Sequence, residues 1–91
     1  MKTNKIYLDY ASSTPIDPRV LHTLYHHLKH TFGNSSSLHF WGQKAQIILD
    51  QSRKTIASFL NVKEKEVYFT SSATESNNTV LKGISSSYRN K

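Results

Sequence analysis

The residues best suited to chemistry gather just after position 69, where hydroxyl side chains cluster. Five of the nine residues from 70 to 78 are serine or threonine. An apolar run typical of a strand precedes them at 67–69, and helical spacing follows. The first turn of a helix leaves backbone N–H groups without intrahelical partners, and the helix dipole adds positive charge there. The stretch therefore predicts an anion site, such as one for a phosphate, with Ser71, Ser72 and Thr74 adding hydroxyl donors.

A purely structural interpretation competes with this one. Ser72, followed three residues later by Glu75, has the spacing of a capping box, in which the two side chains satisfy free amides at a helix start. Capping boxes are common, so this stretch alone favours a helix start over an anion site.

Two helices are predicted upstream. Asp17 before Pro18 is typical of a helix start, while Gly33 and Asn34 tolerate the left-handed conformation that often ends one. Between them, apolar residues recur at helical spacing at Val20, Leu21, Leu24, Tyr25, Leu28 and Phe32. A second apolar pattern predicts a helix from about residue 39 to residue 60, which Asn61 ends.

The expected order is an extended arm at 5–10, a helix, a helix, a strand at 67–70 and a helix from about Ala73. One strand cannot form a sheet by itself, and its edges need partners. The pattern therefore predicts the opening of a larger α/β domain.

Composition limits the possible functions. The 91 residues carry a net charge of +6, but the basic residues are scattered, so we expect no nucleic-acid footprint. There is no cysteine, so the chain supplies no thiol nucleophile. No apolar run follows the charged start or approaches a membrane span, so we expect no membrane segment and a cytoplasmic location.

Four histidines, His22, His26, His27 and His30, are expected on the side of the first helix opposite its apolar residues. His22, His26 and His30 repeat every four residues, and a histidine pair at that spacing can ligate zinc. No acidic residue or cysteine completes the set, so we interpret them as a solvated polar face and expect no metal.

Three blocks, at residues 7–15, 32–42 and 69–78, together resemble the N-terminal region of cysteine desulfurases of the NifS/IscS type. These are pyridoxal-phosphate enzymes of the class V aminotransferase family. The resemblance implies an incomplete N-terminal piece of the α/β, aspartate aminotransferase-like fold of PLP-dependent transferases. Residues 1–16 would be its arm and loop, and residues 17–91 the start of its PLP-binding domain.

The resemblance also implies roles for residues. The positions of Ala73 and Thr74 bind the cofactor phosphate through backbone N–H groups and the threonine hydroxyl, and Ser72 adjoins them. Family members have a glycine at the position of Ser72 and a proline at that of Ser35, so serine is expected to alter the anion site and to loosen the loop.

The other two blocks are expected to build loops. Asp9 and Thr14 would fix loop hydrogen bonds in the arm. Asn34 is interpreted as a helix C-cap, and His39 as a packed or exposed ring.

Full-length members convert L-cysteine to L-alanine and pass the sulfur, as a persulfide, to acceptor proteins of iron–sulfur cluster assembly or thiolation. Their cofactor-binding lysine and catalytic cysteine lie beyond the matched region, so no catalytic residue is assigned and the chain alone is expected to be inactive. Partners implied are a second copy in a homodimer or a complementary C-terminal chain. Three interpretations stay open: a truncated desulfurase, the N-terminal half of a split PLP enzyme, and a small basic binding protein.

Overall fold

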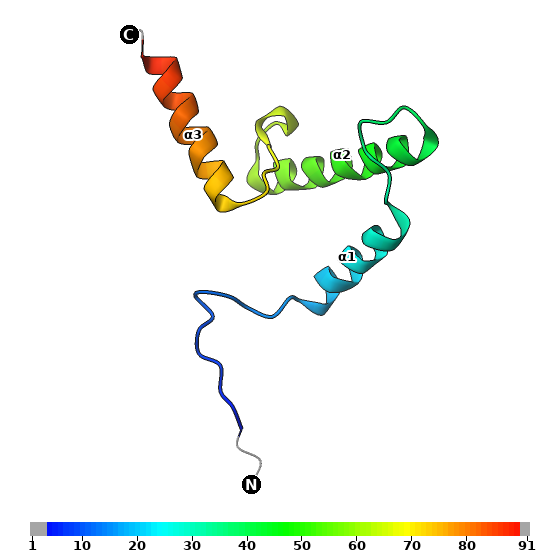
Figure 1. Cartoon of the computed structure of the whole chain (residues 1–91), viewed down its shortest axis with the longest axis vertical. Helices are drawn as coiled ribbons and strands as arrows, with labels where there is room; N and C mark the ends of the chain where they lie inside the picture. The colour runs from blue at the N-terminus through cyan, green and yellow to red at the C-terminus, as the bar shows by residue number, and fades with distance from the viewer. Residues whose placement is uncertain (1–3, 90–91) are drawn as a thin grey trace. The chain divides into compact units, whose positions relative to one another are not determined.

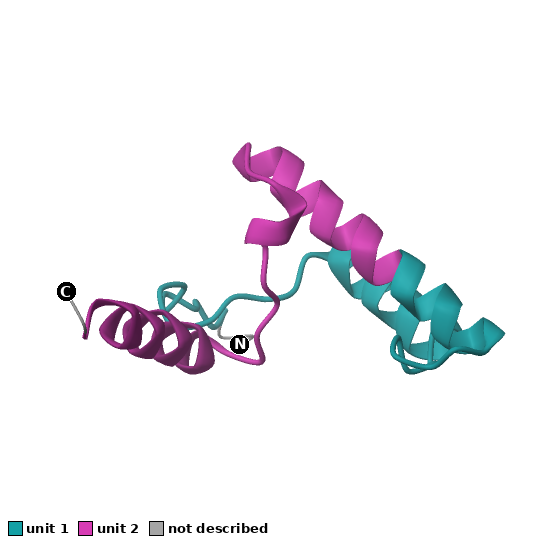
Figure 2. Cartoon of the chain, turned by 90° about the horizontal axis from the view of Figure 1, so that it is seen from above, with its two compact units in different colours: residues 1–47 teal, residues 48–91 magenta. Residues whose placement is uncertain are grey.

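The structure, a computed structural model, describes residues 4–89. It contains helices α1 (Pro18–His30), α2 (Phe40–Leu60) and α3 (Ala73–Tyr88), and a short 3₁₀ turn, η1 (Glu64–Glu66), between α2 and α3 (Figure 1). The chain divides into two compact units, residues 1–47 and 48–91, with the boundary inside α2 (Figure 2). The division at residues 16 and 17 expected from the sequence stays a prediction.

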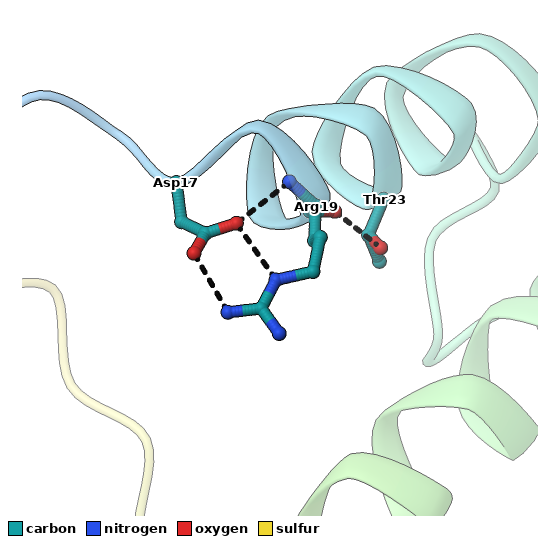
Figure 3. Close-up of polar contacts among 3 residues, drawn as sticks. All are labelled: Asp17, Arg19 and Thr23. Carbon is teal, nitrogen blue, oxygen red and sulfur yellow. Dashed lines mark hydrogen bonds and ion pairs between the residues drawn. The ribbon is translucent and has the colours of Figure 1, made fainter.

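Helix α1 begins as the sequence predicts. The Asp17 carboxylate accepts a hydrogen bond from the Arg19 amide at 2.8 Å, and Pro18 occupies the first turn. The same carboxylate binds the Arg19 guanidinium through Nε at 3.0 Å and Nη2 at 2.8 Å (Figure 3). These bonds from Arg19 hold the pKa of Asp17 below its ordinary value. Arg19, in the first turn of α1, therefore holds the capping carboxylate of Asp17 in place.

The end of α1 corrects the sequence prediction. The helix stops at His30, and the Thr31 amide donates to the His27 carbonyl oxygen at 2.8 Å. No glycine among residues 4–89 has positive φ, so Gly33 does not provide a left-handed cap. Asn34 does not cap the helix either. Its side-chain oxygen accepts a hydrogen bond from the Ser36 amide at 2.9 Å, which forms an Asx turn.

Gly33 and Gly42 are needed for close backbone approach. A Cβ on Gly33 would lie 2.2 Å from the carbonyl oxygen of Trp41, and one on Gly42 would lie 2.2 Å from that of Ser37. The loop between α1 and α2 thus folds directly onto the first turn of α2, where no side chain fits between the two backbones.

The two ends of α2 agree with the sequence. The imidazole Nδ1 of His39 accepts from the Gly42 amide at 3.2 Å, as an N-cap side chain does. Asn61 follows the helix with φ 54°, the left-handed conformation expected of it. The Val62 amide donates to Ala57 at 2.9 Å and the Asn61 amide to Ser58 at 3.3 Å, which is the Schellman pattern.

The strand expected at residues 67–70 does not form within residues 4–89, which contain no strand. Val67 has extended backbone angles, φ −100° and ψ 118°, so the local conformation suits a strand. Strands form only when neighbouring backbone supplies ladder hydrogen bonds, and the described residues provide none. The observed order is arm, helix, helix, 3₁₀ turn, extended segment and helix.

The apolar faces of α1 and α3 are each exposed within residues 4–89. Neither helix has a buried residue, and the hydrophobic residue buried among those described is Ala57 of α2, at 2% exposed. Leu24 of α1 is 47% exposed and Ile84 of α3 is 55% exposed. Amphipathic helices in folded domains bury this face against another layer. The described residues therefore form secondary structure without a substantial core.

His22, His26 and His30 of α1 are exposed, as expected of a polar face, whereas His27 is partly buried beside Val20 and Leu24 and does not belong to that face. The ring centroids of His26 and His30 lie 4.9 Å apart, and those of His26 and His27 lie 5.5 Å apart. The pKa of His26 is lowered by desolvation and then by the charges of His30, His27, His22 and Lys44. Desolvation, and after it the neighbouring positive charges, thus favours the neutral form of the His26 ring.

The glycine contacts yield a prediction with a matched control. We expect Gly42→Ala to displace the loop before α2 at a cost of about 1–3 kcal/mol, because the new methyl group meets backbone atoms that cannot rotate away. Gly83→Ala, inside α3, meets nothing within 4 Å and is expected to stabilise that helix by about 0.5–1 kcal/mol. Circular dichroism and amide exchange measure both effects. Equal stabilisation by the two substitutions would contradict the close approach at Gly42.

Candidate anion site at the start of α3

Ser72 caps α3 as predicted. Its hydroxyl oxygen accepts from the Glu75 amide at 3.2 Å, and its carbonyl oxygen accepts from the Ser76 amide at 3.1 Å. Its backbone is extended, with φ −164° and ψ 164°, a conformation open to any residue. Serine in place of the family's glycine therefore causes no backbone strain at this position.

The second half of the expected capping box is shifted by one residue. The Glu75 carboxylate accepts from the Ser71 amide at 2.7 Å and from the Ser71 hydroxyl, rather than from the Ser72 amide. The bonds from the Ser71 hydroxyl and then its amide hold the pKa of Glu75 below its ordinary value. Glu75 thus closes the turn ahead of the helix and takes up both donors of Ser71.

Thr70 ties the same turn to the helix. Its hydroxyl donates to the Ser72 carbonyl oxygen at 3.1 Å and lies 2.6 Å from the hydroxyl oxygen of Ser76. Ser76 is partly buried, one turn into α3. The hydroxyl-rich stretch is therefore a hydrogen-bonded turn in which most side chains already have partners.

The backbone amides of Ala73 and Thr74 and the hydroxyl of Thr74 differ from the rest of this stretch. Within residues 4–89, no hydrogen bond joins the amide of Ala73, or the amide or hydroxyl of Thr74, to another group of the chain. Both residues are exposed in the first turn of α3. The Ser72 hydroxyl accepts one bond and keeps its own proton free to donate. These donors converge on one helix start, which suits the acceptor oxygens of a phosphate.

Arg53 of α2 positions the segment that leads into this turn. Its guanidinium donates to the Val67 carbonyl oxygen at 3.4 Å, binds Asp50 at 2.8 Å, and lies 5.4 Å from the centre of the Phe69 ring. The side chain is only 27% exposed. The sequence analysis missed Arg53; the three-residue spacing from Asp50 signalled the ion pair but not the long-range contact.

The N-terminal block forms a turn of its own. The carbonyl oxygen of Asp9 accepts from the amides of Ser12 and Ser13 at 3.1 and 3.3 Å, and its carboxylate accepts from the Ser12 hydroxyl at 2.6 Å. The Tyr7 hydroxyl lies 3.0 Å from the carbonyl oxygens of both Asp9 and Ser13. The predicted role of Asp9 is confirmed. No hydrogen bond of Thr14 is found among residues 4–89, so its expected role does not hold there.

A surface hollow of about 570 Å³ lies along α1 rather than at the start of α3. Its lining consists of Arg19, Val20, Thr23, Leu24 and His27. Arg19, Thr23 and His27 border it, but its exposed lining is mostly apolar, whereas small-molecule sites aim placed polar groups into an apolar lining. The hollow is therefore part of the uncovered apolar face of α1.

None of the helices described over residues 4–89 is both long and apolar enough to cross a membrane. The cytoplasmic location stays a prediction.

Comparison with known proteins now identifies the class of protein. The aminotransferase class-V family matches residues 6–91, and the chain belongs to that family. Among curated proteins, it is 46% identical over 90 residues to cysteine desulfurase IscS of Rickettsia typhi. It is 44% identical over 90 residues to that of Rickettsia prowazekii, and 42% identical over 87 residues to that of Neisseria meningitidis serogroup C (strain FAM18).

These matches cover 98%, 98% and 94% of the chain, but the chain spans only 22% of each relative. No solved structure matches the chain. The resemblance to cysteine desulfurases noted in the sequence is confirmed, as is the class V family. The chain is thus a cysteine desulfurase-like sequence of about one fifth of its relatives' length.

The Glu75 contacts predict a pH dependence of the turn. Because the folded pKa of Glu75 is lowered, its stabilising contribution is complete above the ordinary glutamate pKa of about 4.3 and is lost as the pH falls through the lower folded value. We expect the Ser71 amide signal in NMR spectra to shift, and its exchange to accelerate, over that acidic range.

Glu75→Gln is expected to remove this acidic step. Glu66→Gln is the matched control, because the Glu66 carboxylate accepts from the Lys63 amide at 2.7 Å in a different turn. A Ser71 step that persists in Glu75→Gln, or that disappears in Glu66→Gln, would refute the assignment.

Proposed function

We propose that this chain forms the phosphate-anchoring N-terminal part of a pyridoxal-phosphate-dependent cysteine desulfurase. The observation that carries the proposal is the donor set at the start of α3, where the amides of Ala73 and Thr74 and the Thr74 hydroxyl have no partner within residues 4–89. Family membership supports a cofactor phosphate as the anion, and the free Ser72 hydroxyl proton supports a fourth donor.

Pyridoxal phosphate, when bound, supplies the electron sink for bond cleavage at the substrate carbon atoms. The residues of this chain would hold its phosphate through hydrogen bonds to negatively charged oxygens, which are stronger than bonds between neutral groups. The turn closed by Thr70, Ser71 and Glu75 would keep the Ala73 and Thr74 amides aimed at one point. In this arrangement the chain orients the cofactor, and the reacting groups belong to the rest of the fold.

The uncovered apolar faces support the same assignment. Leu28 of α1 is 71% exposed and Leu81 of α3 is 68% exposed, and exposed apolar residues recur along both helices. Faces of this kind are stable in water only when another layer covers them. We propose that the remaining part of the class V fold covers them, either as further residues of the protein or as a complementary chain.

The activity proposed for the assembled fold is the conversion of L-cysteine to L-alanine, with the sulfur passing to an enzyme thiol as a persulfide and then to an acceptor protein. The 91 residues contain no cysteine to receive that sulfur. The proposal assigns the chain no catalytic residue.

Thr74 offers a direct test of the anchor. We expect pyridoxine 5′-phosphate, which lacks the aldehyde that reacts with lysines, to shift the NMR signals of the Ala73 and Thr74 amides. Thr74→Val should weaken this binding about tenfold, because a hydrogen bond to a charged group contributes about 1.5 kcal/mol.

Thr79→Val is the matched control on the same helix. Its hydroxyl donates to the Glu75 carbonyl oxygen at 2.8 Å, so its loss leaves the free donors in place and is expected to leave binding unchanged. Pyridoxine without the phosphate should leave both amide signals in place. Equal shifts with the two compounds would reject a phosphate anchor.

Complementation tests the assembled activity. We expect the 91-residue chain to release no alanine from L-cysteine with pyridoxal phosphate present. Activity should appear when it is mixed with a chain carrying the family residues beyond the matched region, and Thr74→Val should reduce it while Thr79→Val should not. Alanine formation by the isolated chain would overturn the proposal.

A further inference from the structure

Two histidine rings on the exposed face of α1 lie close together and take no part in the candidate anion site. His26 and His30 occupy positions i and i+4 of α1, and both are exposed. Their ring centroids lie 4.9 Å apart, with 43° between the ring planes. Residues four apart on a helix have neighbouring Cβ atoms, so side-chain rotations alone can bring their ring nitrogens toward one point.

The separation fits two rings bound to one metal ion. An imidazole nitrogen binds Zn²⁺ at about 2.0–2.1 Å, which puts the ring centre about 3.2 Å from the ion. Two such rings have centres about 4.5 Å apart when the ligand angle is 90°, and about 5.2 Å apart at the tetrahedral angle. The observed 4.9 Å lies between these two values. The distance between the two rings is therefore compatible with both binding one ion, once side-chain rotation turns a nitrogen of each ring toward it.

His27, the histidine next to His26, makes different contacts. His27 is partly buried, and its Nδ1 lies 3.2 Å from the hydroxyl oxygen of Thr31. Its ring makes an edge contact with His26 at 82° between planes. His27 therefore lies beside the pair without sharing its geometry, which makes it an internal control on the same helix.

We propose that His26 and His30 form a two-histidine site for a first-row divalent cation of the kind that imidazole prefers, such as Zn²⁺, Cu²⁺ or Ni²⁺. Residues 4–89 contain no group of three or more possible ligands, so water completes the coordination. The site revises the sequence interpretation, in which these histidines only form a solvated face. It does not depend on the proposed function, because it lies on α1 and uses none of the donors at the start of α3.

The test is a Zn²⁺ titration of the untagged 91-residue chain, followed by calorimetry and by the imidazole proton signals. We expect one ion to bind and the His26 and His30 signals to shift together. His26→Ala and His30→Ala should each weaken binding about tenfold or more. In the unchanged chain the second imidazole binds the same ion intramolecularly, and either substitution leaves only one imidazole ligand. Alanine is the best helix former, so both variants should keep α1.

His27→Ala should bind Zn²⁺ like the unchanged chain. Because the ion bridges two turns of the folded helix, Zn²⁺ should also slow amide exchange in α1 of the unchanged chain and of His27→Ala, but not of His30→Ala. Absence of binding by the unchanged chain would overturn the proposal. Unchanged binding in His26→Ala or His30→Ala, or equal weakening in His27→Ala, would overturn it as well.

Discussion

Hydrogen bonds between residues close in sequence stabilise most of the local structure, because residues 4–89 form no large apolar core that could do so. Asp17 and Ser72 cap helices with their own side chains, and Asn61 ends α2 in a left-handed conformation. Such contacts each contribute about 1 kcal/mol, far less than the burial of a full helix face. The described helices therefore depend on local hydrogen bonds, while the apolar faces of α1 and α3 stay exposed.

This constraint shapes the candidate site. An anion site made from backbone amides needs only a correctly started helix, so it can form inside a short segment. The turn around Ser71 and Glu75 and the Arg53 contact with Val67 hold that start in place with residues of one unit. A catalytic site needs side chains from several elements of a packed fold, so it cannot form in the same way. The proposed phosphate anchor thus needs only residues of this segment, whereas the activity proposed for the assembled fold would need residues from other elements.

Single residues show how far the sequence could be interpreted. The starts of α1 and α3 were predictable because Asp17 and Ser72 act on amides two or three positions away. The end of α1 was not, since Gly33 is needed for the approach of Trp41, which lies in the next helix. The failed strand at 67–70 has a related cause, because the extended conformation is local whereas pairing needs a distant partner.

By itself, the sequence determined the three helices, the N-caps Asp17 and Ser72, the Asn61 end of α2, the hydroxyl-rich turn before α3 and membership of the class V family, because each follows from short-range bonding or from matching motifs. Only the tertiary structure decided which donors remain free at Ala73 and Thr74, that Glu75 bonds to Ser71, and that Arg53 reaches Val67. It also decided the 4.9 Å spacing of the His26 and His30 rings. These features depend on distances and side-chain directions in space, which residue order alone does not specify.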